Sequence, residues 1–435
     1  MIAVGSGGSG VLMPVAGRAE QAAGASGVAG ATGTLPMGAA ASGGGSGAGG
    51  STSTSGVPTG TAGANSVAGG TGASEAGSSG RAGAAAGAIG GAPDPSGCSD
   101  TCSFAEGVRW ACKLRFMYGV NYAWHTFAGD FGGIQAWNQK GVSEEPLVAS
   151  ELAVMASQGV NVIRWWLWPD FRGDGVSFDA AGNPSGLGGS AIADIARALE
   201  LAEQHDLYIM FTLFSFDNFR PTRSEGTLEV PSLAPIALDD AKRKLLMDNV
   251  VAKVAMAVAG SPHAKRVISW DVINEPEWAI SGPSLYGGDP EFDPMDELTT
   301  VTHAQMETFA RDVITTLRAH SDALISVGGT AIKWRHAWSK LDTDYHQFHI
   351  YDWVNEFWPY SQTSASYGLD DKPVVMGEFP LAGLSGVSYP MLLESWYANG
   401  YAGALGWAYT DPMSGNRNLT DVGAFASKHP CETRY

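Results

Sequence analysis

The sequence at residues 269–278 reads Ser269-Trp270-Asp271-Val272-Ile273-Asn274-Glu275-Pro276-Glu277-Trp278. Its apolar part, which includes Val272 and Ile273, is typical of a buried strand. Pro276 has no amide hydrogen to give to a neighbouring strand, so we expect the strand to end beside Glu275. The carboxyl group of Glu275 is therefore predicted at the tip of a buried strand.

A second stretch ends in the same way about a hundred residues later. It reads Pro373-Val374-Val375-Met376-Gly377-Glu378-Phe379-Pro380 and places Glu378 after another apolar run. Cleavage of a glycosidic bond needs two carboxyl groups, one to protonate the leaving oxygen and one to stabilise or trap the cationic sugar. Glu275 and Glu378 are the pair that we predict for this chemistry.

Short apolar runs alternate with longer amphipathic ones from Arg115 onward, which predicts a (β/α)8 TIM barrel. An open doubly wound sheet is the alternative, but the run that follows Gly119 is no Gly-rich phosphate turn. The predicted strands are Phe116–Asn121, Val160–Trp166, Leu207–Leu213, Val267–Ile273, Leu324–Gly328, Tyr345–Ile350, Val374–Gly377 and Gly403–Ala408. The predicted helices are Glu144–Gln158, Ala191–His205, Leu238–Ala259, Met295–His320 and Tyr389–Asn399.

Composition divides the chain into two parts. Residues 1–94 are mostly Gly, Ala, Ser and Thr and contain no aromatic residue. Such a segment buries too little apolar surface to offset its chain entropy, so we expect a disordered, low-complexity tail or linker. Residues 95–435 hold every Trp, Tyr and Phe and are predicted to form one barrel domain that carries the catalytic site.

The net charge of −18 argues against several partners. An acidic domain is repelled by nucleic acid and by anionic lipid surfaces. No apolar run reaches the 18 or so residues of a membrane-spanning helix. The first residues lack the basic and apolar regions of a signal peptide, so export, if it occurs, depends on a signal not visible here.

The four cysteines lie at the margins of the barrel domain, namely Cys98, Cys102, Cys112 and Cys431. An even count at such places predicts two disulfides that tie both ends of the domain to the base of the barrel. Three pairings are open. A metal site is the rival reading, but no histidine lies at ligand spacing near these cysteines, and we expect no metal.

In a TIM barrel, chemistry gathers at the carboxyl ends of the strands. Polar and aromatic residues follow every predicted strand: Asn121, Trp124 and His125; Arg164, Trp165, Trp166 and Trp168; Ser215, Asp217 and Asn218; Asn274 and Glu275; Lys333 and Trp334; His349 and Tyr351; Glu378; Trp407 and Tyr409. So many at equivalent positions indicate a lined cleft.

These motifs resemble the retaining glycoside hydrolases of clan A, and most closely family 5, which includes endoglucanases and endo-β-1,4-mannanases. The resemblance covers residues 118–409. It implies that Glu275 in Asn-Glu-Pro is the acid/base and that Glu378 in Gly-Glu-Phe is the nucleophile. It also implies that Asn274 binds the sugar 2-hydroxyl and that Arg164 keeps the nucleophile ionised.

The same resemblance assigns roles to residues at the ends of the last strands. His349 and Tyr351 match the family's pair after strand six, with the tyrosine hydroxyl near the nucleophile, and Trp407 matches the platform under the sugar. Other readings are that Arg164 is a salt-bridge partner of Asp271, that His349 is a core histidine and that Trp407 fills the core. Where many family 5 cellulases carry a histidine after strand three, this chain has residues 212–218, which contain none.

Sugar rings stack on aromatic faces, so further tryptophans are candidates for binding subsites. The alternative is that about half of them pack between strands and helices. The candidates are Trp124, Trp168, Trp278, Trp334, Trp353 and Trp358, with His125 beside the first. Trp165 and Trp166 are adjacent in a strand, so at most one faces the barrel interior. Solvated loop charges are expected at Asp217, Glu277, Asp352 and Glu356.

The sequence thus favours a secreted or cell-surface retaining endo-β-glycanase that cuts β-1,4-linked mannan or glucan. We expect a monomer with a polysaccharide substrate and no cofactor, because two carboxyl groups of differing pKa run both steps. Two alternatives stay open. One is a catalytically silent carbohydrate-binding barrel at the cell surface, and the other is a β-glycan transglycosylase.

Overall fold

The computed structural model describes residues 100–102, 104, 106–353, 362–411 and 418–435. The predicted tail at residues 1–94 therefore lies outside the described residues, as do Cys98, Glu356 and Trp358. Within the described part, no helix combines the length and apolar character that a bilayer crossing requires.

Eight parallel strands close into a barrel, which confirms the predicted fold. Each pairs with the next one around the ring, and β14 closes the ring against β3. All eight lie where the apolar runs placed them: β3 (Met117–Asn121), β4 (Val162–Trp166), β7 (Tyr208–Ser215), β10 (Val267–Asn274), β11 (Leu324–Gly329), β12 (His346–His349), β13 (Val374–Glu378) and β14 (Gly403–Gly406).

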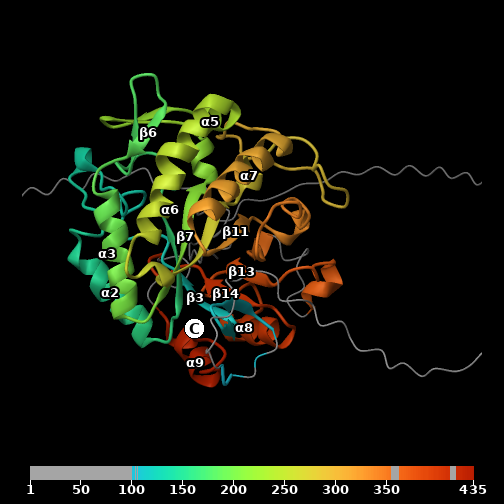
Figure 1. Ribbon diagram of the computed structural model, residues 1–435. Helices are drawn as coiled ribbons and strands as arrows, with labels where there is room; N and C mark the ends of the chain where they lie inside the picture. Colours follow the sequence, from blue (N-terminus) through green and yellow to red (C-terminus); the bar gives the residue numbers. More distant parts are fainter. Residues whose placement is uncertain (1–99, 103, 105, 354–361, 412–417) are drawn as a thin grey trace, which may run out of the picture. The chain divides into compact units, whose positions relative to one another are not determined.

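Helices cover the outside of the barrel, and Figure 1 shows α2, α3, α6 and α7 side by side along one flank. Their apolar stripes pack on the strands, as expected for amphipathic helices. The main helices are α2 (Pro146–Ser157), α3 (Ala191–Gln204), α5 (Asp240–Leu246), α6 (Ala252–Ala259), α7 (His303–His320), α8 (Tyr389–Ala398) and α9 (Thr420–Lys428). A short helix, α4 (Ala234–Leu238), precedes α5, and a π-helical turn at Met247–Val251 joins α5 to α6.

The predicted start of the long helix at Met295 is wrong. The helix α7 begins after Thr302, whose side chain accepts a hydrogen bond from the backbone of Gln305, while the Gln305 side chain binds back to Thr302. This reciprocal capping fixes the first turn of a helix. The residues before it belong to a loop, in which Val301 pairs with Ile280.

Within the described residues, three antiparallel hairpins interrupt the alternation of strands and helices. The hairpin β1 (Val108–Trp110) with β2 (Lys113–Arg115) precedes the barrel. The hairpin β5 (Val176–Phe178) with β6 (Pro184–Leu187) follows β4, and β8 (Arg223–Glu225) with β9 (Leu228–Val230) follows β7. Both later hairpins therefore lie in loops that leave the carboxyl ends of barrel strands.

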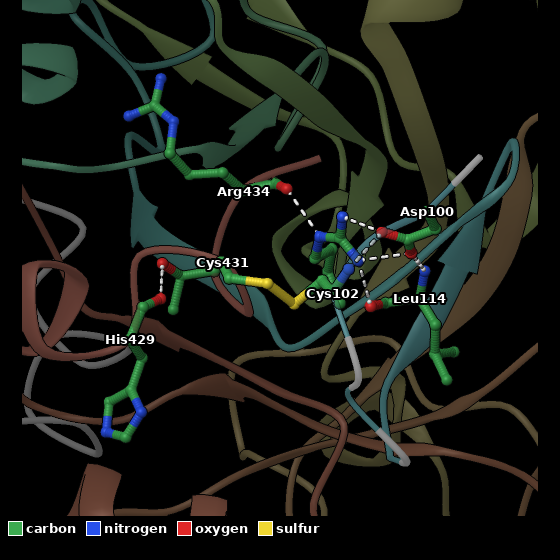
Figure 2. The surroundings of a disulfide bond; sticks show 8 residues. Asp100, Cys102, Leu114, His429, Cys431 and Arg434 are labelled. Atoms are coloured by element: carbon green, nitrogen blue, oxygen red, sulfur yellow. Dashed lines mark hydrogen bonds and ion pairs between the residues drawn. A yellow bond between two sulfur atoms is a disulfide. The ribbon is translucent and has the colours of Figure 1, made fainter. Parts of the chain in front are cut away.

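The amino ends of the strands are tied to the chain's last residues. Cys102 forms a disulfide with Cys431, which links the two ends of the domain and excludes the two pairings that join Cys102 to another cysteine. Cys112 is also disulfide-bonded, so none of these three offers a thiolate to a metal. Arg115 binds the carboxylate of Asp100 and the main-chain oxygen of Arg434. Figure 2 shows Asp100 and Arg434 near the Cys102–Cys431 disulfide.

Candidate active site

Glu275 and Glu378 lie at the ends of β10 and β13, and both side chains lie close to His349 at the end of β12. The Nδ1 atom of His349 is 2.8 Å from Oε1 of Glu275 and 3.5 Å from Oε2 of Glu378. Carboxylate oxygens of the two glutamates and this nitrogen all lie within 4.8 Å of one another. The histidine therefore stands between the two carboxyl groups.

The backbone of Glu275 leaves the strand in an uncommon conformation. Its φ of 49° and ψ of 48° lie in the left-handed region, which costs free energy for a residue with a side chain. Its amide donates to the main-chain oxygen of Gly328 at 2.6 Å, and Pro276 begins a 3-10 turn directly after it. The neighbouring strand and the proline together hold the strained turn that places Glu275 beside His349 and Glu378.

Glu378 is held by two donors, one from β4 and one that follows the end of β12. Arg164 Nη1 lies 2.5 Å from Oε1 of Glu378, and the hydroxyl of Tyr351 donates to Oε2 at 2.8 Å. The same guanidinium donates to the side-chain oxygens of Asn121 at 2.9 Å and Asn274 at 2.7 Å. Arg164 therefore connects residues from three other strands, β3, β10 and β13.

Arg164 also forms a salt bridge with Asp271, which was the alternative interpretation of this arginine from the sequence. Both Nε and Nη2 bind Oδ2 of Asp271, at 2.9 and 2.7 Å, and Thr212 donates to the same oxygen. Both partners are completely buried. A buried ion pair is costly unless its hydrogen bonds are satisfied, and here the arginine meets two carboxylates and two amide oxygens.

Burial raises the pKa values of both glutamates, but different neighbouring groups lower them. Burial raises the pKa of Glu275 to about 7, against a hydrogen bond from Trp278 and the more distant charge of Arg164. Burial also raises the pKa of Glu378, but this carboxylate touches the guanidinium of Arg164 directly. Burial lowers the pKa of His349 to about 4, so its ring is neutral at pH 7. Glu275 is thus suited to carry a proton and Glu378 to stay ionised.

Aromatic side chains lie beside Arg164 and beside Glu275. Trp166, Trp407 and Trp124 form one cluster, with ring centroids 5.3 to 6.0 Å apart, and the Arg164 guanidinium lies 5.3 Å from the Trp166 ring. Trp278 donates from Nε1 to Oε2 of Glu275 at 2.8 Å. Trp353 packs on Trp278 at 5.2 Å.

Two predicted subsite tryptophans lie elsewhere. Trp168 and Trp334 are each only 1% exposed and belong to the main apolar core, so their faces meet protein side chains. Trp165 is also buried, whereas Trp166 faces Arg164 at the mouth of the barrel, as strand alternation requires. Trp124, Trp278 and Trp353 are half-buried and remain candidates for contact with a sugar.

Several polar candidates have partners that explain their positions. His125 pairs with Glu151 of α2 at 2.9 Å, which raises the pKa of the imidazole. Asp217 and Glu277, which were expected to be solvated, are buried instead. Asp217 binds Arg220, and Glu277 accepts from Thr330 and Trp338. Polar partners from neighbouring loops make burial of these carboxyl groups tolerable.

Glu275, His349 and Glu378 also have spacing that a metal ion would accept. Arg164 and Tyr351 already satisfy Glu378, while Trp278 and His349 satisfy Glu275. A guanidinium in direct contact disfavours a second cation on the same carboxylate. The donors present fit a proton-transfer pair rather than a metal centre.

Comparisons with known proteins show what the chain is similar to. No family model matches the chain. A mannan endo-1,4-β-mannosidase of Mytilus edulis is 27% identical over 338 residues, which cover 71% of this chain and 87% of that protein. A mannan endo-1,4-β-mannosidase of Cryptopygus antarcticus is 22% identical over 331 residues, 68% of this chain and 80% of that protein. The chain is a homologue of these enzymes. This relationship confirms the resemblance to glycoside hydrolases of clan A and family 5.

The barrel itself has solved counterparts. The β-1,4-mannanase of the sea hare Aplysia kurodai superposes with a TM-score of 0.62 at 19% identity, over 76% of this chain and 97% of that one. At this level of identity the likeness concerns the fold alone. For this homologue of mannan endo-1,4-β-mannosidases, the site must therefore be argued from its own residues.

Some site residues of this mannosidase homologue were not singled out from the sequence. Asp271 was considered only as a rival partner for Arg164, and Thr212 and Gln347 were not considered. All three are buried polar side chains around the guanidinium. A signal for Asp271 was present, because it and Arg164 are the sole charged residues in the strands β10 and β4, and lone buried charges need a partner.

Proposed function

We propose that the chain is a retaining endo-β-1,4-mannanase in which Glu275 is the acid/base and Glu378 is the nucleophile. The observation that carries this proposal is the approach of the two carboxylates within 4.8 Å at the mouth of the barrel. Retaining enzymes hold their carboxyl groups about 5 to 5.5 Å apart, whereas inverting enzymes leave about 6.5 to 9.5 Å for a water molecule. The narrow gap supports attack by the enzyme itself.

In the first step, Glu378 attacks the anomeric carbon and the bond to the leaving oxygen breaks. Glu275 gives its proton to that oxygen, and Glu378 becomes covalently bound to the sugar. The pKa of about 7 keeps Glu275 protonated in mildly acidic solution, ready for this transfer. The contact with Arg164 favours the ionised form that Glu378 needs.

In the second step, the ionised Glu275 takes a proton from water, whose oxygen attacks the same anomeric carbon. The bond to Glu378 breaks, and both carboxyl groups return to their starting states. Two displacements at one carbon retain its configuration. The cycle needs only these two carboxyl groups, and no step passes through a cofactor.

The neighbouring residues have supporting roles in this proposal. Asn274, oriented by Arg164, is placed to bind the sugar 2-hydroxyl. Tyr351 and His349 fix the two carboxyl groups relative to each other. Trp407, packed on Trp166 and only 7% exposed, offers an edge or face to the sugar at the cleavage point.

Mannan is the substrate that the relatives support. Both curated relatives are named for endo-cleavage of mannan, and the chain covers at least 80% of each of them. The segment after β7 places Asp217 and Asn218 where many family 5 cellulases carry a histidine, which also favours mannan over cellulose. We propose a monomer that acts on this polysaccharide.

Export to the cell surface or the medium completes the proposal. The Cys102–Cys431 disulfide and the disulfide-bonded Cys112 support an oxidising compartment, because structural disulfides are rare in reducing ones. The insoluble or high-molecular-weight glycans that such an enzyme cuts are found outside the cell.

The test compares the wild-type protein with two variants on mannan, carboxymethylcellulose and xylan. Release of reducing ends from mannan is expected for the wild type, and Glu275→Ala and Glu378→Ala should each abolish it. Azide should restore activity to Glu378→Ala and give a glycosyl azide of inverted configuration, because a small anion then fills the place of the nucleophile. Undiminished activity in either variant contradicts the assignment.

The alternatives give different results in the same assays. A silent sugar-binding barrel would release no reducing ends from any glycan, although it would bind them. A transglycosylase would form products longer than the substrate at high concentrations of mannohexaose. The intact set of Glu275, Glu378 and Arg164 contacts favours the hydrolase over the silent barrel.

A further inference from the structure

The guanidinium of Arg164 has all five of its N–H groups in use. Nε and one N–H of Nη2 donate to Oδ2 of Asp271, at 2.9 and 2.7 Å. The other N–H of Nη2 donates to Asn274 at 2.7 Å, and Nη1 donates to Asn121 at 2.9 Å and to Glu378 at 2.5 Å. Because no donor is left over, these acceptors fix the group in one orientation.

Two of these acceptors are carboxylates, and they meet the guanidinium through different nitrogen atoms. Asp271 contacts Nε and Nη2, whereas Glu378 contacts Nη1. The remaining acceptors are amide oxygens, which carry no net charge. One positive charge therefore serves two negative ones, and the share that Asp271 takes is not available to the proposed nucleophile.

These three charged side chains are shielded from water. Arg164 and Asp271 are completely buried, and the side chain of Glu378 is 4% exposed. Charges act strongly on one another where no water screens them, so the second carboxylate has a large effect on the first. If Glu378 were the sole anionic partner of the guanidinium, its electron pairs would be held too tightly for attack on carbon.

Asp271 uses only one of its two oxygen atoms for these contacts. Besides Arg164, the hydroxyl of Thr212 donates to Oδ2 at 3.0 Å and the side-chain amide of Gln347 at 3.4 Å. Oδ1 is buried and has no hydrogen-bond partner among the described residues. A buried acceptor without a donor costs free energy, and its presence here points to a role for the charge beyond stability.

We propose that Asp271 is a positioning residue that draws part of the charge of Arg164 away from Glu378 and so keeps the proposed nucleophile reactive. The inference rests on the proposed function and adds to it a residue that regulates the strength of the attack. Asp271 is completely buried and acts through the guanidinium. Arg164 favours the ionised form of Glu378, and Asp271 prevents that form from becoming too weak a base.

The acid limb of the pH profile reports on this balance. It is the fall of kcat/KM toward low pH, where Glu378 becomes protonated in the free enzyme. Among the described residues, the other titratable groups that face Glu378 are Tyr351, which donates to Oε2 at 2.8 Å, the neutral ring of His349 at 3.5 Å and the carboxyl group of Glu275. All three stay in place when only the charge behind the guanidinium is changed.

Asp271→Asn in the full chain tests the role of the charge. The amide keeps an oxygen that accepts from Arg164 and loses the charge, so Glu378 meets the whole guanidinium and becomes harder to protonate. The acid limb of kcat/KM on mannohexaose should therefore move to lower pH by about one unit. A purely structural role for Asp271 predicts the opposite, because a displaced guanidinium would leave Glu378 easier to protonate. A shift to higher pH, or no shift, overturns the inference.

Thr212→Val changes the same balance in the other direction and leaves the carboxylate in place. It removes the hydroxyl that donates to Oδ2 of Asp271, so the carboxylate holds the guanidinium more tightly. The acid limb should then move to higher pH. Circular dichroism at each pH confirms that both variants stay folded over the range measured. If Asp271→Asn does not fold, an acid limb of Thr212→Val that moves to lower pH or stays unchanged overturns the inference.

Asp194→Asn is the matched control. Asp194 is also a completely buried carboxylate, but its donors are Gly132, Ser143 and Ser190, which lie outside the proposed site. Its replacement should leave the acid limb in place. An equal shift in Asp194→Asn and Asp271→Asn would show a general effect of lost charge and would overturn the role given to Asp271.

Glu378→Ala separates this inference from the proposed function. If that variant keeps the activity of the wild type, the proposed function fails and the role of Asp271 fails with it. If Glu378→Ala is inactive and the acid limb of Asp271→Asn does not move to lower pH, the function stands and the role of Asp271 alone is overturned. If the wild type cuts glucan but not mannan, the same pH profiles on cellohexaose decide the role of Asp271.

Discussion

Glu275 and Glu378 are both buried, yet they meet different neighbours. Glu378 touches a guanidinium, whereas Glu275 touches an indole N–H and a neutral imidazole. A carboxyl group without a direct cation in an apolar setting keeps its proton to higher pH. The division of labour between the two glutamates therefore follows from the contacts of each side chain.

The pH dependence of kcat/KM should report this difference. Glu275 acts in its protonated form in the first step, and burial raises its pKa to about 7. Activity should therefore fall as the pH rises through 7, about tenfold per unit above it, and should also fall on the acid side as Glu378, whose pKa burial raises, becomes protonated. The measurement is kcat/KM on mannohexaose from pH 4 to 9. A flat profile to pH 9 would show that Glu275 is not the acid.

Trp278→Phe should move that alkaline limb to higher pH. The indole N–H of Trp278 favours the ionised form of Glu275, so its removal raises the pKa of the carboxyl group. Trp353→Phe is the control, since Trp353 packs on the ring of Trp278 and its replacement leaves the indole N–H of Trp278 in place. A shift to lower pH, or equal shifts in both variants, would contradict the role given to this hydrogen bond.

Gly328 makes room for the Arg164–Asp271 pair. A Cβ atom at this position would lie 2.9 Å from Oδ2 of Asp271 and 3.0 Å from Nη2 of Arg164. Gly328→Ala should therefore displace the guanidinium and lower kcat by up to about a hundredfold, the effect of a misplacement near 1 Å. Gly287→Ala, where a Cβ meets nothing within 4 Å, should leave kcat unchanged. Full activity of Gly328→Ala would mean that the pair tolerates displacement.

For single residues, the sequence predicted the side chains that belong to a recognisable motif and missed those that do not. Glu275, Glu378, His349 and Tyr351 each follow an apolar run, and that pattern alone places them at strand ends. Thr212 and Gln347 lie inside strands and matter only through contacts across the barrel. Such contacts depend on register, which a single strand's pattern does not specify.

Strands were easier to predict than helix ends and loops. Buried parallel strands read as continuous apolar runs, and all eight lay where expected. The helix α7 began later than its apolar pattern, because capping by Thr302 and Gln305 rather than periodicity sets the first turn. The hairpins β5–β6 and β8–β9 were not predicted, since short half-exposed strands carry little periodicity.

The loop after β10 is fastened to the loop after β11 by one carboxyl group. Oε2 of Glu277 accepts from the amide and hydroxyl of Thr330, at 3.1 and 2.7 Å, and Oε1 accepts from Trp338 at 2.8 Å. Because Glu277 follows the strained residue Glu275 by two positions, this fastening also supports the turn that carries the proposed acid.

Glu277→Gln should therefore destabilise the fold. An amide has one acceptor oxygen and cannot accept from both directions, so at least one donor loses its partner, at a cost of about 1 to 3 kcal/mol. The measurement is the free energy of unfolding in urea. Glu200→Gln, on the exposed face of α3, should cost well under 1 kcal/mol. Equal stability of Glu277→Gln and wild type would show that these hydrogen bonds are dispensable.

Across the whole molecule, the first and last parts of the described barrel domain are joined at the base. Besides the disulfide, Phe116 donates its amide to the main-chain oxygen of Glu432, and the amide of Tyr435 donates to Asn161. Phe116 and Asn161 directly precede β3 and β4. The junction therefore lies at the end of the barrel opposite Glu275 and Glu378, so stability and catalysis are served by different ends of the same strands.

This separation predicts what loss of the disulfide does. The bond joins residues 329 positions apart, and closing so long a loop restricts the unfolded chain by up to about 5 kcal/mol. Cys102→Ser with Cys431→Ser should lower the free energy of unfolding by an amount up to this value. The kcat on mannohexaose at 25 °C should stay within about twofold of wild type, because the Arg115 contacts and the Tyr435 amide still hold the base of the folded barrel.

Thermal unfolding followed by circular dichroism, with and without a reductant, measures the loss of stability. The reductant should lower the Tm of the wild type more than that of the variant, which retains only the disulfide at Cys112. Loss of kcat in a folded variant would show that the base and the mouth of the barrel are coupled, contrary to their separation in the structure.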